Sequence, residues 1–541
     1  MGTEWDDRAD VVVVGFGGAG ACAAIEAAGR GAEVLVLDRF GGGGATAVSG
    51  GVVYAGGGTA IQREAGVADS PAAMFDYLRH EVGDAVSPDT LRRFCAESAG
   101  MIDWLRGHGV PFQASLCPYK TSYPNDSYYL YYSGSETAWP FRDLATPAPR
   151  GHRAHGPGTS GRVLFAALAD AAARAGARVL RQTSATRLVT DDAGRVVGVE
   201  CATLSGAPAR IRRAHALLSR YATKPGLYLP ALARRLGRRI AAIERRHAKP
   251  YRVLARRGVV LAAGGFVTNR TMLREHAPAY RGGLPLGTLG DDGSGIRLGV
   301  AAGGMTDRMG LVSAWRFLSP PSALLGGILV NAAGRRFADE SSYGALLGQR
   351  MITEQGGRAW LLIDTPTRRA ALRQLRTEAL WFQRLQARYL LGFDRMRGSL
   401  EQVARRAGID AAGLAATVAS YRDGTADAFG KQPELVRPLD SGPYYLIDCS
   451  ARPRLGYPCP MLTLGGLVVA EDNGQVLGAD GTPVPGLYAA GRTAVGICSN
   501  SYVSGLSLAD CVFSGRRAGI SSTVDCAPGS PGAGQVRDAH G

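Results

Sequence analysis

The chain has 541 residues, of which 46% are hydrophobic and 20% are charged, and its mean hydropathy is −0.03. This composition excludes an intrinsically disordered chain and, at about 100–200 residues per domain, predicts two to four structural units. The formal net charge is +16, but thirteen Arg and two Lys against the single acid Glu244 place 14 of those charges in residues 206–258, so the composition gives no nucleic-acid signal and we expect no nucleic-acid partner.

The sequence lacks an apolar run of about 18 residues, the length that a membrane-spanning helix needs. Its first ten residues are acidic and polar, so we also expect no secretory signal and place the protein in the cytoplasm. The nine cysteines are scattered and form no C-x-x-C pair. This spacing predicts reduced thiols and argues against zinc, iron–sulfur clusters and c-type haem, so we expect no metal site.

A nucleotide-binding motif opens the chain. Residues 9–14 form a β-branched run, which is typical of a buried parallel strand. A Gly-x-Gly-x-x-Gly motif follows at 15–20, then an Ala-rich stretch that predicts a helix from about 21 to 30, and a second strand over 33–37 that ends in Asp38. A lone glycine motif is weak, but strand, helix, strand and acid in this order predict dinucleotide binding.

The residue types of this motif have physical reasons. Gly15 allows the tight turn, Gly17 lets the backbone approach a pyrophosphate, and Gly20 permits close packing of helix on strand. The N–H groups at the start of the helix attract the phosphates. Asp38 is placed to accept a hydrogen bond from a ribose hydroxyl.

Two later segments favour FAD over NAD. Residues 41–51 are almost all glycine, alanine, serine and threonine, and a flavin enzyme needs bare backbone and small hydroxyls beside the isoalloxazine. Near the C-terminus, a strand over 485–490 runs into Gly491, and an Ala/Gly-rich helix begins at about 504–510. The sequence therefore predicts FAD as the cofactor.

Four blocks of the sequence together resemble the fumarate reductase and succinate dehydrogenase flavoprotein superfamily. They are the first motif and residues 259–266, 292–296 and 329–340, within a resemblance that covers roughly 10–519. The resemblance implies an α/β fold with a discontinuous Rossmann-like FAD-binding domain and an inserted α+β capping domain. The implied boundaries are 1–304 and 445–525 for the FAD-binding domain and 305–444 for the cap, and a Pro/Gly-rich tail, 526–541, is expected to be disordered.

The same resemblance implies a set of cofactor-binding residues. They are Gly15, Gly17, Gly18, Ala19, Gly20, Asp38, Arg39, Ala45, Thr46, Ser49, Gly50, Gly51, Ala263, Gly264, Asp292, Gly491, Ser507 and Leu508. No His lies in 41–51, so the covalent His–flavin bond of the respiratory members is not expected and the FAD should be non-covalent. Arg492 stands where many FAD enzymes place a Glu for the ribityl chain.

Two positions separate this chain from the members that reduce dicarboxylates. Those members carry a His before a Thr-Met-Gly-Gly-like block and an Arg after the cap's Asn-Glu motif, whereas this sequence has no His at 459–466 and has Tyr343 at the second place. Tyr502-Val503-Ser504 matches the Tyr-x-Ser element of the flavin-dependent 3-ketosteroid dehydrogenases of the Δ4-(5α) type; the Δ1 type carries Tyr-Pro-Gly. The resemblance thus implies Tyr343, Tyr502 and Ser504 as catalytic residues.

The implied reaction forms a C=C bond next to a ketone of a steroid-like substrate, with an external electron acceptor. The ketone must be polarised while a base removes the α-proton. We assign Tyr502 to the carbonyl and Ser504, relayed through Tyr343, to the proton, although exchanging these roles fits the sequence equally well. The alternatives are a flavin-dependent reductase of an unsaturated acid or ketone and a non-catalytic sterol-binding flavoprotein.

Two further segments have open interpretations. Six tyrosines over 119–132 form either a wall for a flat apolar ligand or a loop packed over the FAD domain, and the neighbouring residues 150–153 receive no unique role. The basic segment 206–258 interrupts a hairpin, and its leucines and isoleucines from 229 to 243 recur at helical spacing. This insert is either a peripheral contact with the inner membrane surface or a solvated arm or subunit contact.

Overall fold

The central sheet is built on the first nucleotide-binding motif. The computed structural model describes residues 4–224, 228–280, 282–393, 395–423, 427–452 and 456–524, so the tail expected at 526–541 lies outside the described residues. The β-branched run forms β1 (Asp7–Val14), which pairs in parallel with β2 (Val34–Asp38) and with β9 (Lys249–Leu261). The predicted buried parallel strand is therefore confirmed.

The order of the main strands is β19-β20-β9-β1-β2-β6, and β8 extends the sheet by pairing with β9 and β7. The β8–β9 and β7–β8 pairs are antiparallel, while β20 runs parallel to β9. These strands are β6 (Arg178–Arg181), β7 (Thr183–Thr190), β8 (Val196–Thr203), β19 (Gln475–Leu477) and β20 (Pro483–Ala489).

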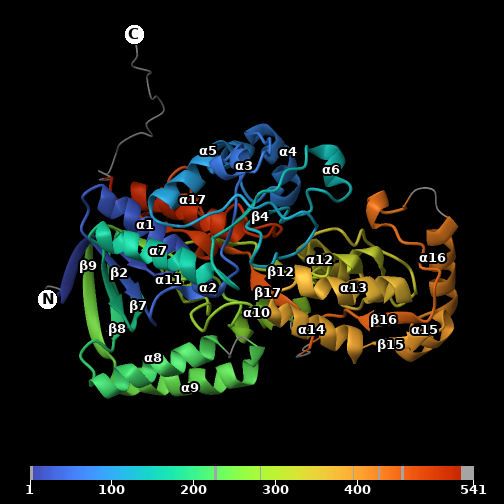
Figure 1. Cartoon of the computed structure of the whole chain (residues 1–541). Helices are drawn as coiled ribbons and strands as arrows, with labels where there is room; N and C mark the ends of the chain where they lie inside the picture. Colours follow the sequence, from blue (N-terminus) through green and yellow to red (C-terminus); the bar gives the residue numbers. More distant parts are fainter. Residues whose placement is uncertain are drawn as a thin grey trace, which may run out of the picture.

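Helices cover both faces of this sheet, because the side chains of a strand alternate between its faces. Val11 and Val13 of β1 belong to a core that includes α1 (Gly18–Gly29), α7 (Gly161–Arg174) and α17 (Leu506–Ser521). Val12 and Val14 belong to a second core, which includes α11 (Ser294–Ala301). Figure 1 shows α1, α7 and α17 together above the sheet.

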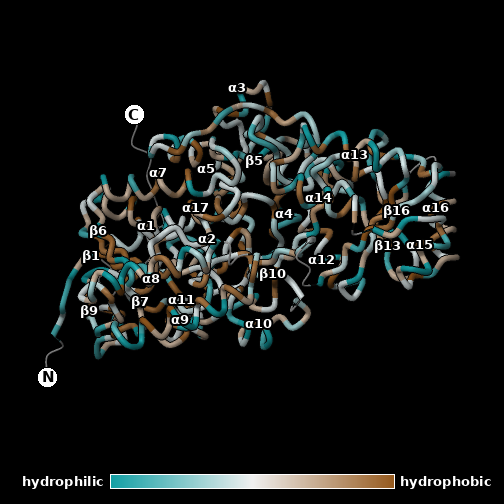
Figure 2. The backbone as a smooth tube through the Cα atoms, turned by 60° about the horizontal axis from the view of Figure 1, so that its bottom comes forward, coloured by the Kyte–Doolittle hydropathy of each residue, from teal (hydrophilic) through white to brown (hydrophobic). Residues whose placement is uncertain are grey.

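A smaller antiparallel sheet, in the order β13-β14-β16-β15, lies at the other end of the molecule (Figure 1). Its strands are β13 (Ile328–Val330), β14 (Trp360–Ile363), β15 (Met396–Gly398) and β16 (Tyr444–Asp448). The helices around it are α12 (Gly344–Glu354), α13 (Thr365–Glu378), α14 (Trp381–Gly392), α15 (Leu400–Ala407) and α16 (Ala411–Asp423). Figure 2, in which the chain is coloured by residue hydropathy, shows hydrophobic residues near β1 in the main sheet and near β16 in this one. The domain boundaries remain a prediction.

Three small sheets and further helices complete the described part of the fold. Three small sheets have the orders β3-β5-β4, β10-β17-β12 and β11-β18. Their strands are β3 (Val52–Tyr54), β4 (Leu130–Tyr131), β5 (Gly151–Arg153), β10 (Leu284–Pro285), β11 (Thr306–Asp307), β12 (Val312–Ala314), β17 (Pro460–Thr463) and β18 (Gly466–Leu467). The remaining helices are α2 (Gly44–Val48), α3 (Ala60–Glu64), α4 (Pro71–Val82), α5 (Pro88–Gly107), α6 (Phe141–Leu144), α10 (Arg270–His276), η2 (Pro278–Tyr280), η3 (Ser322–Gly326), η4 (Pro433–Leu435) and η5 (Gly491–Thr493).

The basic segment forms a pair of helices, α8 (Ala209–Thr223) and α9 (Pro230–His247), which we call the arm. The sequence predicts a helix over 229–243, close to α9, but not α8. The apolar stripe of α9 packs inward, with Leu236 and Ile240 buried against α8, Phe40 and Leu289. Among the residues that the structure describes, no helix has the length and apolar character needed to cross a bilayer.

Candidate active site

A large cavity of about 1070 Å³ runs from the N-terminus of α1 to the loop that precedes α17. One end, which we call the dinucleotide end, is lined by the first glycine motif and by residues 38–46. The other end, the aromatic end, is lined by Trp315, Phe317, Tyr343 and Tyr502. A polar end joined to a flat apolar end suits a nucleotide cofactor with an apolar substrate beside it.

The dinucleotide end fits the pyrophosphate and ribose of FAD. Gly15 has a φ of +104°, and a Cβ there would lie 2.5 Å from the carbonyl oxygen of Ala262, so the turn accepts only glycine. Above Gly17 the space is open, because the nearest atoms to a Cβ there would be 3.9 Å away. Gly17 also caps α1 without a side chain, which leaves the first turn of the helix accessible to an anion.

The packing of α1 explains the third glycine. A Cβ on Gly20 would lie 1.9 Å from the carbonyl oxygen of Gly15, so only glycine allows the helix to begin this close to the turn. The hydroxyl of Thr46 accepts a hydrogen bond from the N–H of Gly18 (3.0 Å), and this bond ties α2 to α1. Asp38 accepts hydrogen bonds from the N–H groups of Phe16 (3.0 Å), Phe40 (2.8 Å) and Gly42 (3.0 Å), which fixes its carboxylate at the cavity wall.

Most of the residues proposed from the resemblance line this cavity. Those in its wall are Gly15, Gly17, Gly18, Ala19, Asp38, Arg39, Ala45, Thr46, Ser49, Gly50, Gly51, Ala263, Gly264, Ser507, Leu508, Tyr343, Tyr502 and Ser504. Gly20, Asp292 and Gly491 lie outside the wall. Gly491 packs behind it, where a Cβ would lie 2.9 Å from the Cβ of Ala19.

Asp291, rather than its neighbour Asp292, faces the cavity. Asp292 accepts a hydrogen bond from the N–H of Ser294, the first residue of α11 (2.9 Å), and pairs with Arg39 (3.0 Å). Asp291 accepts from Arg492 Nη2 at 2.7 Å, and both residues line the cavity. Sequence reasoning noted Arg492 as a departure and missed the carboxylate that accompanies it. The Nη1 atom of Arg492 is buried without a hydrogen-bond partner, so the site offers a donor to an acceptor-rich group such as FAD.

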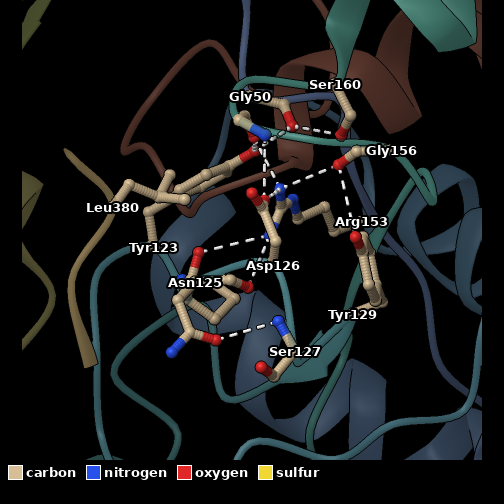
Figure 3. A network of polar contacts seen from close by, with 12 residues as sticks. Gly50, Tyr123, Asn125, Asp126, Ser127, Tyr129, Arg153, Gly156, Ser160 and Leu380 are labelled. Carbon is tan, nitrogen blue, oxygen red and sulfur yellow. Dashed lines mark hydrogen bonds and ion pairs between the residues drawn. The ribbon is translucent and has the colours of Figure 1, made fainter. Parts of the chain in front are cut away.

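The segment of small residues is held by the tyrosine-rich loop (Figure 3). Tyr123 lines the cavity, and its hydroxyl donates to the carbonyl of Gly50 at 2.7 Å. Arg153, fully buried, donates to Asn125 O (2.7 Å) and to Asp126 Oδ1 (2.6 Å), and its guanidinium lies over the Tyr123 ring. Arg153, whose sequence context indicates no unique role, therefore fixes the loop against the cavity wall.

The three catalytic candidates meet at the aromatic end. The ring of Tyr502 stacks on Trp315 with centroids 5.0 Å apart, and the Tyr343 and Tyr502 centroids are 6.4 Å apart. Tyr343 is the residue directly before α12, whereas Tyr502 and Ser504 lie in the loop before α17. Residues more than 150 positions apart in the sequence thus share one wall of the cavity.

A third tyrosine joins this group. The hydroxyls of Tyr131 and Ser504 are 3.2 Å apart and form a hydrogen bond in the protein interior. Ser133 donates to the carbonyl of Ser504 (3.0 Å), and the hydroxyl of Ser135 accepts from the N–H of Tyr343 (2.9 Å). The segment 131–135 therefore positions both halves of the group. The sequence drew attention to Tyr131 only as one of six tyrosines.

All three phenols are held in their protonated form. Burial raises the pKa of Tyr343, Tyr502 and Tyr131 above the usual value of a tyrosine, while a hydrogen bond with Ser504 opposes the shift at Tyr343 and Tyr131. At Tyr502 the nearby Arg492 and the N–H of Gly505 oppose it. At neutral pH these hydroxyls are hydrogen-bond donors rather than anions.

A buried acid anchors the loop that carries Tyr502 and Ser504. Glu81 accepts from Ser501 Oγ and from Tyr77 OH, each at 2.8 Å, and its carbonyl accepts from the Asn500 side chain at 3.0 Å. Burial, opposed by these hydrogen bonds, raises the pKa of Glu81 to about 7. No pattern in the sequence around residue 81 indicates this role, because the loop residues that Glu81 holds, Asn500 and Ser501, lie about 420 positions away.

With the fold and the cavity established, the chain can be placed in a family. It belongs to the family described as the FAD binding domain, which matches residues 10–507, so it is an FAD-binding protein as the first motif predicts. Within that family, it is 42% identical to the 3-oxo-5-alpha-steroid 4-dehydrogenase of Comamonas testosteroni, over 90% of this chain and 93% of the relative.

A solved structure and a more distant relative agree with this placement. The 3-ketosteroid-delta4-(5alpha)-dehydrogenase of Rhodococcus jostii RHA1, solved with 4-androstene-3,17-dione, superposes with a TM-score of 0.80 at 33% identity and covers 97% of this chain and 98% of its own. The fumarate reductase (cytochrome) of Shewanella frigidimarina is 24% identical over 95% of this chain and 76% of its own length. The predicted superfamily and the predicted resemblance to Δ4-(5α) dehydrogenases are confirmed.

Proposed function

We propose that the protein is an FAD-dependent dehydrogenase that introduces a C=C bond next to the ketone of a 3-ketosteroid or a similar polycyclic substrate. The observation that carries this proposal is the meeting of Tyr343, Tyr502 and Ser504 at the apolar end of the cavity. The similarity to two steroid dehydrogenases supports the substrate class. Neutral hydroxyls and aromatic faces suit an uncharged flat ketone.

The residues divide the work of the reaction. Tyr502, a protonated phenol, donates a hydrogen bond to the ketone oxygen and so acidifies the adjacent C–H. Ser504 takes the α-proton while its own hydroxyl proton moves to the Tyr343 oxygen and the Tyr343 phenol proton leaves to water. Trp315 holds the Tyr502 ring in place by stacking. The β-hydrogen leaves as hydride, which FAD accepts when bound, and an external electron acceptor then reoxidises the flavin. The substrate thus loses one proton and one hydride.

Anaerobic flavin bleaching separates this function from its alternatives. A 5α-saturated 3-ketosteroid should reduce the bound FAD of the holoenzyme. The flavin absorbance near 450 nm should then fall on a catalytic timescale. Oxidation of pre-reduced enzyme by fumarate or another enoate, without bleaching by the steroid, would instead identify a reductase. If neither reaction occurs, the dehydrogenase proposal is overturned in favour of a binding protein.

We also propose that the protein contacts an anionic bilayer peripherally, and that α14 supplies the apolar part of this contact. Trp381, Leu385, Tyr389 and Phe393 recur every four residues on one side of the helix and are 74%, 67%, 44% and 85% exposed. The opposite side lines the cavity through residues such as Ala387 and Leu390. A membrane-borne steroid would thus meet the protein beside its cavity.

The charge around this stripe favours a bilayer over a second protein copy. Arg373, Arg376 and Arg388 are exposed on α13 and α14, and Arg238 and Arg246 are exposed on the arm. In Figure 1 the arm and α14 both lie along the lower side of the molecule. Aromatic residues flanked by arginine are typical of interfacial helices. The contact expected through 206–258 is therefore proposed to be electrostatic, because the apolar stripe of α9 is buried.

Co-sedimentation with vesicles tests the proposed surface. Full-length protein should sediment with vesicles that contain anionic lipid at low salt, and Leu385→Ser with Phe393→Ser should reduce the bound fraction at least about tenfold. Arg238→Gln with Arg246→Gln should reduce binding less and weaken its salt dependence. Failure of the wild type to bind, or a wild-type dimer that the α14 variant turns into a monomer, would overturn the membrane contact.

A further inference from the structure

The arm closes over the dinucleotide end of the cavity. Part of the cavity wall comes from the inner side of α8 and from the residues that follow it: Ala216, Ser219, Arg220, Tyr221, Thr223, Lys224 and Tyr228. The rest of this end is the first glycine motif and residues 38–46, where FAD binds by family and by fit. We propose that the arm is part of the FAD site and retains the cofactor, so that FAD leaves only when the arm opens.

An ion-pair network holds the arm against the nucleotide loop. Arg39, directly after Asp38, donates through Nε and Nη2 to the two carboxylate oxygens of Glu244 on α9, at 3.0 and 2.9 Å. Its third nitrogen, Nη1, donates to Asp292 at 3.0 Å. A bidentate pair of this kind fixes both distance and orientation. Glu244 is the only acid between residues 206 and 258, so this pair has no substitute within the arm.

His215 extends the network to α8. Gln182 Nε2 donates to the carbonyl of Arg212 at 2.8 Å and lies 3.1 Å from His215 Nδ1, so Nδ1 accepts and the ring proton sits on Nε2. That Nε2–H then donates to Glu244 Oε1 at 3.1 Å. Burial opposes ionisation of Glu244, but the hydrogen bonds from His215 and Arg39 lower its pKa. The network is therefore complete with Glu244 as a carboxylate.

Apolar contacts also hold the arm against the nucleotide-binding loops. Leu236 and Ile240 of α9 and Ala222 of α8 form a small core with Phe40 and Leu289 from the nucleotide-binding loops. The ring of Phe40 also stacks on that of His215, with centroids 5.9 Å apart. Opening the arm would expose this core and break the Arg39–Glu244 pair together, which sets a barrier to cofactor release.

The inner surface of the arm is suited to an anion. Arg220 and Lys224 line the cavity together with Arg162 on α7. Burial and the nearby Arg162 lower the pKa of Lys224, which shows that the cations crowd one another. A pyrophosphate placed between them would relieve this repulsion. The basic character of the arm thus has a role at the cofactor as well as at the surface.

Cofactor release tests the proposal without reference to catalysis. In holoenzyme diluted below its cofactor affinity, FAD release is followed by the rise in flavin fluorescence. We expect Glu244→Gln to speed release at least about tenfold, because the isosteric amide keeps the shape but loses the charge of the pair. Arg235→Gln, an exposed change on the same helix, is the matched control and should stay within about twofold of the wild type.

A second variant removes the arm at its natural boundary. Thr203 of β8 pairs with Lys249 of β9, so residues 204–248 can be replaced by an Asn-Gly turn that leaves both strands intact. This variant should bind FAD at least about a hundredfold more weakly by fluorescence titration. The proposal would be overturned if Glu244→Gln released FAD at the wild-type rate and the armless protein, with an unchanged circular dichroism spectrum, bound FAD with wild-type affinity.

Discussion

Burial makes the tyrosines around Ser504 donors. The pKa of each phenol is raised, first by its removal from water, so none supplies a phenolate at neutral pH. A ketone oxygen is polarised by a hydrogen-bond donor. A serine that is hydrogen-bonded to protonated phenols can pass a proton on only if the phenols pass on their own protons at the same time. We therefore propose that Tyr502, rather than Ser504, polarises the ketone.

Single substitutions in this group should slow chemistry and leave the cofactor bound. Tyr502→Phe and Ser504→Ala should each reduce the rate of flavin reduction by at least about a hundredfold, the usual range for lost acid–base assistance. Stopped-flow absorbance of holoenzyme mixed with a saturated 3-ketosteroid measures this rate. Tyr389→Phe, on the outer side of α14, serves as the control. Rates near the wild type in both variants would remove these residues from the mechanism.

Glu81 predicts a pH dependence of stability. Its pKa rises from the usual 4.5 to about 7 on folding, so its stabilising contribution is fully present below about 4.5 and is lost as the pH rises through about 7. The loss amounts to about 3 kcal/mol. The groups that face this carboxyl are Tyr77, Ser501, Glu136 and Lys120.

Glu81→Gln should remove this dependence, because the amide has no charge to bury. Urea unfolding of both proteins from pH 4.5 to pH 8 should show the wild type losing stability relative to the variant as the pH rises. Parallel curves for the two proteins would show that Glu81 does not titrate in this range.

At the scale of elements, the tyrosine-rich loop depends on one buried side chain. Arg153→Gln should destabilise the protein by about 3 kcal/mol, because Asp126 and several loop carbonyls lose their charged donor. Thermal unfolding measures the change, and hydrogen exchange should localise it to residues 123–129. Arg106→Gln, an exposed change on α5, should have little effect. Equal melting temperatures for all three proteins would contradict the role given to Arg153.

The sequence predicts elements well where local pattern decides them. The motif of β1, α1 and β2 follows from a β-branched run, three glycines and an acid within about 30 residues, as a βαβ unit requires. The helix near α9 follows from its period, but its packing partners Phe40 and Leu289 are remote in the sequence, so its apolar stripe could equally have faced a membrane. Helix α8 was not predicted.

The site residues, too, were predicted only where a local sequence pattern marks them. Tyr343, Tyr502 and Ser504 were found by resemblance to a family motif and are brought together by the fold. Asp291 and Asp292 are adjacent in the sequence, and only the turn in which Asp291 accepts from the N–H of Thr288 decides which one faces the cavity. The roles of Tyr131, Ser135 and Glu81 depend on contacts between distant segments, which no local pattern specifies.

For the whole molecule, we expect a non-covalent flavin. Among the described residues that line the cavity there is no histidine, and residues 41–51 contain none. The purified protein should be yellow, and acid or heat should release all of its FAD into the supernatant. Yellow colour that stays with the denatured chain on a gel would contradict this prediction.

We propose that this cavity removes one proton and one hydride from a saturated 3-ketosteroid. The most direct measurement is an anaerobic single turnover of holoenzyme with a 5α-saturated 3-ketosteroid, with the product identified by mass spectrometry and its ultraviolet absorbance. One conjugated enone should form for each FAD reduced, and the similarity to the Δ4-(5α) dehydrogenases leads us to expect its double bond at the 4-position. Reduction of the flavin with a double bond at another position, or recovery of unchanged steroid beside fully oxidised FAD, would contradict it.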